Sequence, residues 1–167
     1  DRAVAMVSCD PGHVDTALAE SQLADEQRVM VRQITTGQEG VQIVVGRAGA
    51  GKTTALSAAV SLWRASGCTV TGAALAARTA KQLGDEAGIT STTLESLLHG
   101  LDATPPCHTD VLVVDEAAMV GTRQLARLID RTTAAGARGA LLGNVQHHLR
   151  RVRCDPDAVQ FHGLSGS

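Results

Sequence analysis

Aromatic side chains are almost missing from this sequence, which has one Trp, one Phe and no Tyr among 167 residues. Many proteins that bind single-stranded nucleic acid stack the bases on aromatic side chains, and this chain has little means of doing so. Trp63 falls on the apolar stripe of an expected helix, so we place it in the core. Any binding of nucleic acid must then involve backbone amides, threonines and a few arginines, and its affinity should be low and salt-sensitive.

Long apolar runs are missing as well. None approaches the roughly 20 residues that a membrane-spanning helix needs, and the start lacks the charged and apolar regions of a signal peptide. The four cysteines lie far apart and form no CxxC pair, which favours free thiols over a zinc site or a disulfide framework. We therefore expect a cytoplasmic protein with no membrane partner. The cysteines are Cys9, Cys68, Cys107 and Cys154.

A basic excess is also missing, because the formal net charge is −2. Composition alone therefore gives no argument for nucleic-acid binding. The basic residues are nearly all arginine, and the only lysines are Lys52 and Lys81. In a chain that otherwise uses arginine, a lysine suggests a site that needs an ammonium group.

Short apolar strands and amphipathic helices alternate along the chain. The strands are apolar throughout, which predicts a parallel sheet covered on both faces, as in α/β proteins. Length allows one main domain over residues 21–150. Residues 1–20 form a partly ordered lead-in with a turn at "CDPGH", and after about residue 150 the pattern fades into a tail, 151–167. The start at Asp1 suggests a fragment. Strands are expected within 40–46, 68–75, 110–117 and 137–144, and helices within 23–37, 52–67, 76–88, 91–100 and 121–136.

Residues 46–53, GRAGAGKT, match the phosphate-loop pattern G-x-x-x-x-G-K-[ST] between an expected strand and an expected helix. Gly46, Gly49 and Gly51 allow left-handed backbone, so that N–H groups can face phosphate oxygens. The helix N-terminus adds partial positive charge, Lys52 adds an ammonium, and Thr53 offers a hydroxyl to Mg²⁺. A glycine-rich turn with an incidental lysine is the less favoured alternative. The expected ATP-binding residues in this stretch are Gly46, Arg47, Ala48, Gly49, Ala50, Gly51, Lys52, Thr53 and Thr54.

Two acids, Asp115 and Glu116, end the apolar run "VLVVDEA". Parallel sheets collect ligands at the carboxyl ends of their strands, so Asp115 is expected to hold Mg²⁺ through a water, as a Walker B acid does. Glu116 could take a proton from the attacking water, which makes it and Lys52 the candidate catalytic residues. Alternatively, the two acids simply begin a helix, where carboxylates are favoured.

At this point the chain resembles a known family. Gln27 in "LADEQRVMV" is similar to the Q motif of superfamily 1 helicases, whose glutamine binds the adenine edge. "VVGRAGAGKTTAL", "VTGAALAARTAKQL", "GITSTTLESLL" and "VLVVDEAAMVGTRQL" follow in the order of RecD-like helicase domains. The resemblance is strongest to the helicase part of MobF-type (TraA/TraI/TrwC-like) conjugative relaxases, and it covers roughly residues 21–145.

The resemblance implies a P-loop NTPase with a RecA-like sheet, acting as an ATP-driven, Mg²⁺-dependent motor on single-stranded DNA. It places Thr71, Arg78, Thr92 and Thr93 near the DNA path. It also implies a second RecA-like lobe in the parent protein, which supplies an arginine finger, and the 167-residue chain has room for only the first lobe.

One run departs from the family pattern. Where the family has Gly-Asp-x-x-Gln-Leu, with a glutamine that senses the γ-phosphate, this chain has "GNVQHHL", so that Asn144 and Gln146 are the nearest candidates for the sensor. Two other functions stay open: a nucleotide-binding module with decayed hydrolysis, and a P-loop small-molecule kinase. The kinase would need an arginine-rich lid that the sequence does not offer.

Overall fold

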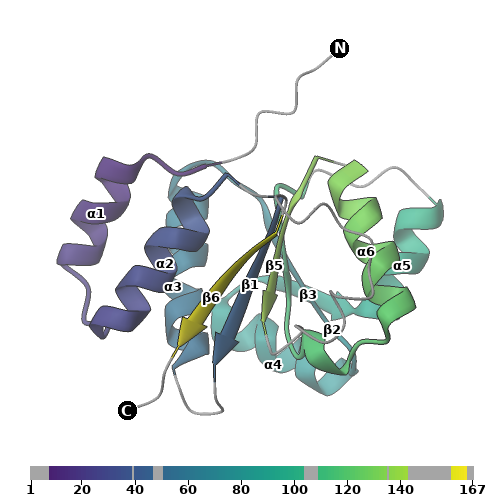
Figure 1. Ribbon diagram of the computed structural model, residues 1–167. Helices are drawn as coiled ribbons and strands as arrows, with labels where there is room; N and C mark the ends of the chain where they lie inside the picture. Colours follow the sequence, from purple (N-terminus) through teal and green to yellow (C-terminus); the bar gives the residue numbers. More distant parts are fainter. Residues whose placement is uncertain are drawn as a thin grey trace.

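In the part of the chain that the structure describes, six parallel strands form one sheet in the order β3-β2-β4-β5-β1-β6 (Figure 1). The computed structural model describes residues 8–38, 40–46, 51–103, 109–134, 136–142 and 159–164. Neighbouring strands along the whole order pair in parallel, which confirms the α/β class and the parallel sheet. The strands are β1 (Val41–Gly46), β2 (Val70–Ala74), β3 (Thr90–Thr93), β4 (Val111–Val114), β5 (Arg138–Leu142) and β6 (Val159–Leu164).

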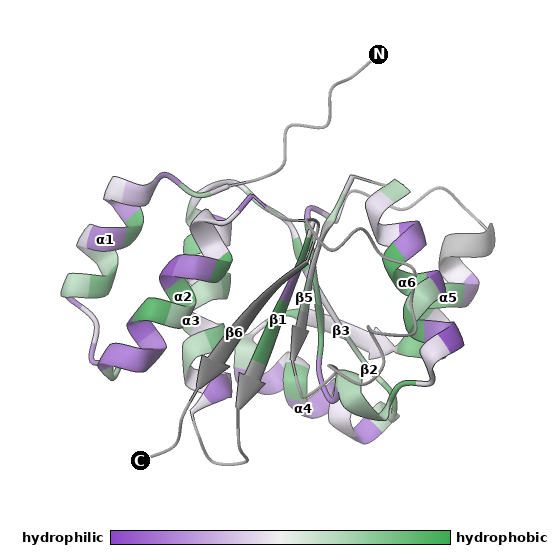
Figure 2. Cartoon of the chain, viewed as in Figure 1, coloured by the Kyte–Doolittle hydropathy of each residue, from purple (hydrophilic) through white to green (hydrophobic). Residues whose placement is uncertain are grey.

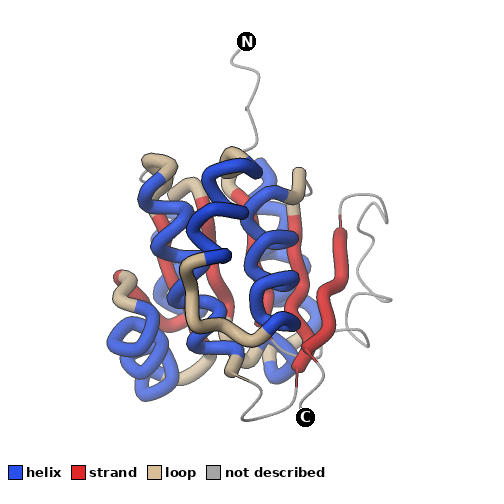
Figure 3. Tube along the Cα trace, turned by 90° about the vertical axis from the view of Figure 1, so that its left-hand side faces the viewer, coloured by secondary structure: helices blue, strands red, loops and turns tan. Residues whose placement is uncertain are grey.

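The helices cover the sheet on two faces (Figures 1 and 3). One core cluster joins α1, α2, α3 and the end of α4 to one face of the strands, and a second joins α5 and α6 to the other face. Figure 2 shows green, apolar stretches on these helices beside purple, hydrophilic ones. The helices are α1 (Pro11–Ala19), α2 (Asp25–Thr36), α3 (Lys52–Ala65), α4 (Ala77–Ala87), α5 (Leu94–Ala103) and α6 (Thr122–Ala134), with a 3₁₀ turn, η1 (Ala117–Met119).

Strand β4 shows why the expected strands are apolar throughout. Val111 and Val113 lie in the first core cluster, whereas Leu112 and Val114 lie in the second. Successive side chains of a strand point to opposite faces, and here both faces are covered by helices. A central strand of this kind needs apolar residues at every position.

The helices after the first two expected strands follow their sequence patterns. Leu56, Val60 and Trp63 of α3 are buried on one face, as predicted. Gly67 and Gly88 follow α3 and α4 with φ of 81° and 67°, the left-handed conformation in which glycine commonly ends a helix.

The amino-terminal expectation of a turn at "CDPGH" is wrong. Asp10 caps α1, accepting a hydrogen bond at Oδ1 from the His13 N–H at 2.9 Å, and Pro11 takes the first helical position. Val14 and Leu18 of α1 are buried in the first core cluster. The periodic signal is weak because a helix of nine residues on the outside of the layer buries few side chains.

Two strands were missed by the sequence pattern. β3 occupies residues 90–93 and so overlaps the start of the segment expected as a helix, 91–100. Thr93 then caps α5 by accepting a hydrogen bond from the Ser96 N–H at 3.2 Å. α5 runs on to Ala103, into the expected loop. β6, in the expected tail, pairs with β1 from Val41↔Val159 to Gly46↔Leu164.

Within the described part of the chain, no helix is both long and apolar enough to cross a membrane.

Candidate active site

The expected phosphate loop and the expected acid pair lie at the same edge of the sheet. β1 ends at Gly46 and β4 at Val114, and β5 lies between these two strands. All three strands are parallel, so their carboxyl ends meet at one edge, where ligands of open α/β sheets bind. The end of β1, at Gly46, and the acids after β4 are therefore one strand apart.

Gly51 has the backbone that the phosphate-loop pattern requires of its last glycine. It stands at the N-cap of α3 with φ 70° and ψ 24°, in the left-handed region. A Cβ at this position would lie 2.0 Å from Nε2 of Gln27, closer than any real contact. The conformation thus calls for glycine, and any larger residue would also displace the end of the Gln27 side chain.

Gln27 connects the start of α2 to the start of α3. Its Oε1 accepts a hydrogen bond from the Ala24 N–H at 3.0 Å, and its Nε2 donates to the Gly51 carbonyl at 3.2 Å. The same carbonyl accepts from the Ala55 N–H at 3.1 Å, within the first turn of α3. The structure therefore brings Gln27 to the end of the phosphate loop, 24 residues away in sequence.

The first residues of α3 carry the groups expected to hold phosphate and metal. Lys52 is half-buried, whereas Thr53 and Thr54 are exposed. α3 has 14 residues, long enough for its N-terminus to carry the partial positive charge that favours anions. The other residues expected in the phosphate loop, Arg47, Ala48, Gly49 and Ala50, lie outside the described residues.

The acid pair does not begin an α-helix. Asp115 and Glu116 lead into the three-residue η1, and α6 starts only at Thr122. Oδ1 of half-buried Asp115 accepts a hydrogen bond from the Glu116 N–H at 2.8 Å, which fixes the carboxylate at the turn that leaves β4. The acids thus precede a short 3₁₀ turn with Glu116 at its N-cap, whose side chain makes no capping hydrogen bond, and they do not begin an α-helix.

Glu116 has an unusual backbone. Its φ of 51° makes it the one non-glycine residue with positive φ within the described ranges, a conformation that costs about 1–3 kcal/mol and occurs often at functional sites. Its side chain is exposed, and Oε2 accepts a hydrogen bond from the Thr79 hydroxyl at 3.4 Å. Thr79 lies in the first turn of α4 and was not singled out by the sequence patterns.

The donor set fits a magnesium–triphosphate group. Mg²⁺ in such sites takes one or two protein ligands and fills its other positions with phosphate oxygens and waters. The exposed Thr53 hydroxyl and the Asp115 carboxylate supply that number. The described residues contain no group of three or more His, Cys, Asp or Glu that could hold a metal by themselves, so a metal here would depend on the phosphates.

The four residues expected near DNA do not all lie together. Arg78 is exposed in the first turn of α4, and Thr92 and Thr93 are half-buried in the last two positions of β3. Thr71 instead lies near the amino end of β2, where its hydroxyl pairs with that of Thr109 at 3.1 Å. The structure thus separates Thr71 from the other three.

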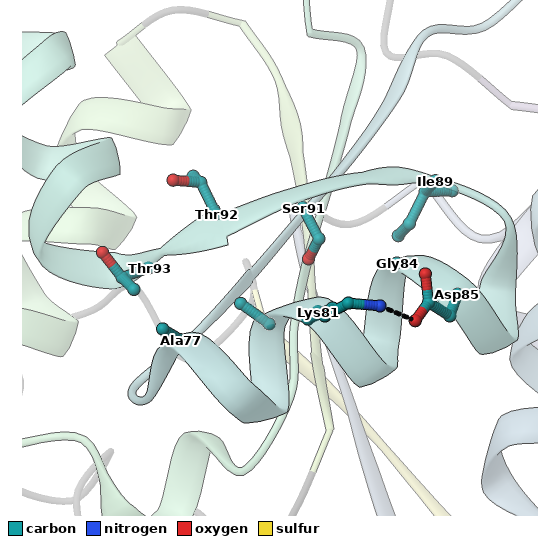
Figure 4. A pocket seen from close by; sticks show the side chains of 9 residues that line it. Ala77, Lys81, Gly84, Asp85, Ile89, Ser91, Thr92 and Thr93 are labelled. Carbon is teal, nitrogen blue, oxygen red and sulfur yellow. Dashed lines mark hydrogen bonds and ion pairs between the residues drawn. The ribbon is translucent and has the colours of Figure 1, made fainter.

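Between α4 and β3 lies an open pocket of about 440 Å³ (Figure 4). Thr92 and Thr93 line it together with Ser91, and Lys81 lies at its side in an ion pair with Asp85, 2.5 Å long. Lys81, Thr92 and Thr93 had each been singled out in the sequence, and the structure brings them together at this pocket. Asn144 and Gln146, the expected phosphate sensors, lie outside the described residues.

A profile of the family described as "AAA domain" matches residues 22–149. The chain belongs to this family. Its sequence is 42% identical over 126 residues to the probable conjugal transfer protein TraA of Sinorhizobium fredii, and 40% identical over 126 residues to the conjugal transfer protein TraA of Rhizobium radiobacter. The alignments cover 74% and 73% of this chain and 11% of each relative, so the chain spans about a ninth of their length.

Two solved structures share the fold of this AAA domain. One is the UvsW helicase of bacteriophage T4, with a TM-score of 0.70 at 8% identity over 94% of this chain and 70% of that one. The other is the ATPase domain of a Thermus phage large terminase, with a TM-score of 0.56 at 11% identity over 91% and 84%. The expected P-loop fold and the resemblance to RecD-like helicase domains of conjugative transfer proteins are confirmed.

Proposed function

We propose that this AAA domain is the first motor lobe of a DNA helicase within a conjugative relaxase, binding ATP with Mg²⁺ and coupling its hydrolysis to movement along single-stranded DNA. The observation that carries the proposal is the meeting of two motifs at one sheet edge. The end of the phosphate loop, fastened to Gln27, lies one strand away from Asp115 and Glu116. Similarity to conjugal transfer proteins supports the biological setting.

Each residue has a distinct task in this proposal. Backbone N–H groups at the start of α3 and the Lys52 ammonium would bind phosphate oxygens, because both present positive charge to the anion. Thr53 and Asp115 would hold Mg²⁺, which neutralises charge on the triphosphate when bound. Glu116 would accept a proton from the attacking water.

Gln27 is proposed to link nucleotide binding to the loop. Its carboxamide has one donor and one acceptor group, the set needed to bind an adenine edge. In the structure both are held by backbone groups, Ala24 N–H and Gly51 C=O. Adenine would bind to the second N–H and the second lone pair of the carboxamide, or would replace one of these backbone bonds.

The isolated lobe should turn over ATP slowly. A second lobe, which would belong to the parent protein, is proposed to close over the nucleotide and to supply an arginine. An arginine in that role is worth about 10³–10⁵ in rate in comparable phosphoryl-transfer sites. Single-stranded DNA is the proposed second partner, contacting Arg78, Thr92 and Thr93 at the same edge. Thr71, held by Thr109, is not proposed as a contact.

The test is ATP binding and hydrolysis by the chain, with and without oligo(dT). We expect measurable Mg-ATP binding, slow hydrolysis and no unwinding. Glu116→Gln should bind Mg-ATP as the native chain does but abolish hydrolysis. Glu95→Gln, which changes another exposed glutamate, on α5, should leave both binding and hydrolysis unchanged. Fast DNA-stimulated hydrolysis by the single lobe, or full hydrolysis by Glu116→Gln, would refute the proposal.

A further inference from the structure

The turn between α1 and α2, residues 21–24, lies beside the Gln27 side chain. The Ala24 N–H of this turn donates to Gln27 Oε1 at 3.0 Å, and Nε2 of the same carboxamide donates to the Gly51 carbonyl. A base that binds the remaining donor and acceptor of this carboxamide would therefore lie next to the turn. Leu23 attaches the turn to the core, because its side chain is buried, whereas Ala24 is exposed.

Arg28 holds the other end of this turn. Its Nη2 donates to the Ser21 carbonyl at 3.0 Å, seven residues back along the chain. Ser21 is in turn attached to α1, because its N–H and its hydroxyl both donate to the Leu18 carbonyl, at 3.2 and 2.7 Å. Arg28 Nη1 also pairs with Asp25 at 3.4 Å, but the Asp25 side chain is 98% exposed, so this contact contributes little. The bond to Ser21 is thus the main interaction of the guanidinium.

Part of the Arg28 guanidinium is enclosed by the protein. Its Nε is buried and has no hydrogen-bond partner among the described residues. Buried donors are nearly always paired, so this one lowers stability and needs an explanation other than stability. Arg32, one turn further along α2, provides the contrast, because it is exposed and forms an ion pair with Asp15 of α1. Both arginines join α2 to the segment before it, but only Arg28 binds the turn next to Gln27.

We propose that Arg28 is a positioning residue for recognition of the nucleotide base. Its bond to Ser21 fixes the 21–24 turn, and the Ala24 N–H of that turn then sets the orientation of the Gln27 carboxamide. The inference rests on the proposed binding of adenine by Gln27. A carboxamide that is oriented in advance binds a base edge with less loss of conformational freedom. Arg28 should therefore affect the affinity for the base and not the affinity for the phosphates, which are proposed to bind at the start of α3.

Titration calorimetry with Mg-ATP and with Mg-tripolyphosphate separates the base from the phosphates. Arg28→Ala should bind Mg-ATP about threefold to tenfold more weakly, the effect of one lost hydrogen bond, and Mg-tripolyphosphate as the native chain does. Arg28→Lys should show the same loss, because a hydrated ammonium does not replace an enclosed guanidinium. Arg32→Ala, the matched control, should bind both ligands with native affinity. A native ratio of the two affinities in either Arg28 variant, or an equal effect in Arg32→Ala, overturns the proposal.

A second measurement needs no nucleotide. NMR relaxation of the Gln27 side-chain amide nitrogen should report a rigid carboxamide in the native chain and in Arg32→Ala, and a mobile one in Arg28→Ala and Arg28→Lys. A carboxamide that stays rigid in both Arg28 variants also overturns the proposal. Failure of the proposed function looks different: the native chain itself would then bind Mg-ATP no more tightly than Mg-tripolyphosphate, or would bind neither.

Discussion

Replacement of Gly51 by alanine tests the contact between the phosphate loop and Gln27. Gly51, just before α3, and Gly67, just after it, share a left-handed backbone but differ in their surroundings. Gly51 has φ 70° and a Cβ there would meet Gln27 Nε2 at 2.0 Å, whereas Gly67 has φ 81° and nothing within 4 Å of a Cβ. Gly67→Ala is therefore the matched control, because it measures the free-energy cost of the left-handed backbone alone.

The expected costs follow from these surroundings. Left-handed backbone costs an alanine about 1–2 kcal/mol, and this term applies to both variants. At Gly51 the Gln27 side chain must also swing aside, which removes its hydrogen bonds to Ala24 N–H and Gly51 C=O. Each is worth about 0.5–1.5 kcal/mol net, so Gly51→Ala should be less stable than Gly67→Ala by about 1–3 kcal/mol.

Urea unfolding followed by tryptophan fluorescence measures these differences. Trp63 is the only tryptophan and is fully buried, so its emission reports the folded core. In a Gln27→Ala background the obstructing amide is gone, and the cost of Gly51→Ala should fall to that of Gly67→Ala. Equal costs for the two glycines in the native background, or a Gly51→Ala cost that Gln27→Ala leaves unchanged, would show that Gln27 does not pack against the loop.

Two further predictions concern the amino-terminal helix. Asp10→Ala should lower the free energy of unfolding by about 1 kcal/mol, because it removes the cap of α1. Asp25→Ala, at an exposed residue that pairs with Arg28 one turn away, should change it by less than about 0.5 kcal/mol. Equal effects of the two substitutions in urea unfolding would contradict the cap. The hydrogen bond from Arg32 lowers the pKa of Asp15 below its ordinary 3.8. The contribution of the ion pair to the free energy of unfolding is therefore present above pH 3.8 and is lost as the pH falls through the pKa of Asp15 in the folded state. Asp15→Asn should therefore be less stable than the native chain at neutral pH and low salt, and the two should be equally stable at a pH below the pKa of Asp15 in the folded state. A stability difference that persists in acid would show that the ion pair is not its source.

The positions of the candidate site residues in the fold could be predicted where local chemistry determines structure. Gly51 and Lys52 follow from the phosphate-loop pattern at the start of a helix, and Asp115 follows from the apolar run before it, which indicates a buried strand. Their roles in nucleotide binding stay a prediction. The family resemblance singled out Gln27 as an adenine-binding residue, but its contact with Gly51 was not predicted, because it joins residues 24 apart in sequence. Thr79 gave no signal, since a hydrogen bond from α4 to the end of β4 depends on which strands are neighbours in the sheet.

The missed elements have a common physical origin. β3 is a short strand of Thr90–Thr93, whose threonines also suit a helix cap, and Thr93 does both. β6 lies at the sheet edge beside β1, and its sequence, "VQFHGL", carries too few apolar residues to indicate a buried strand. α1 adds only Val14 and Leu18 to the core. Pairing with a neighbouring element, rather than local pattern, determines these three segments.

Mg-ATP binding by Lys52→Ala, measured by titration calorimetry, tests the central claim most directly. Lys81→Ala is the control, because it removes the only other lysine, which forms an exposed ion pair with Asp85 away from the phosphate loop. A hydrogen bond to a charged group is worth about 1.5–3 kcal/mol, so Lys52→Ala should bind about tenfold more weakly or worse, and Lys81→Ala should bind as the native chain does. Native affinity in Lys52→Ala would contradict the assignment of this sheet edge as the nucleotide site.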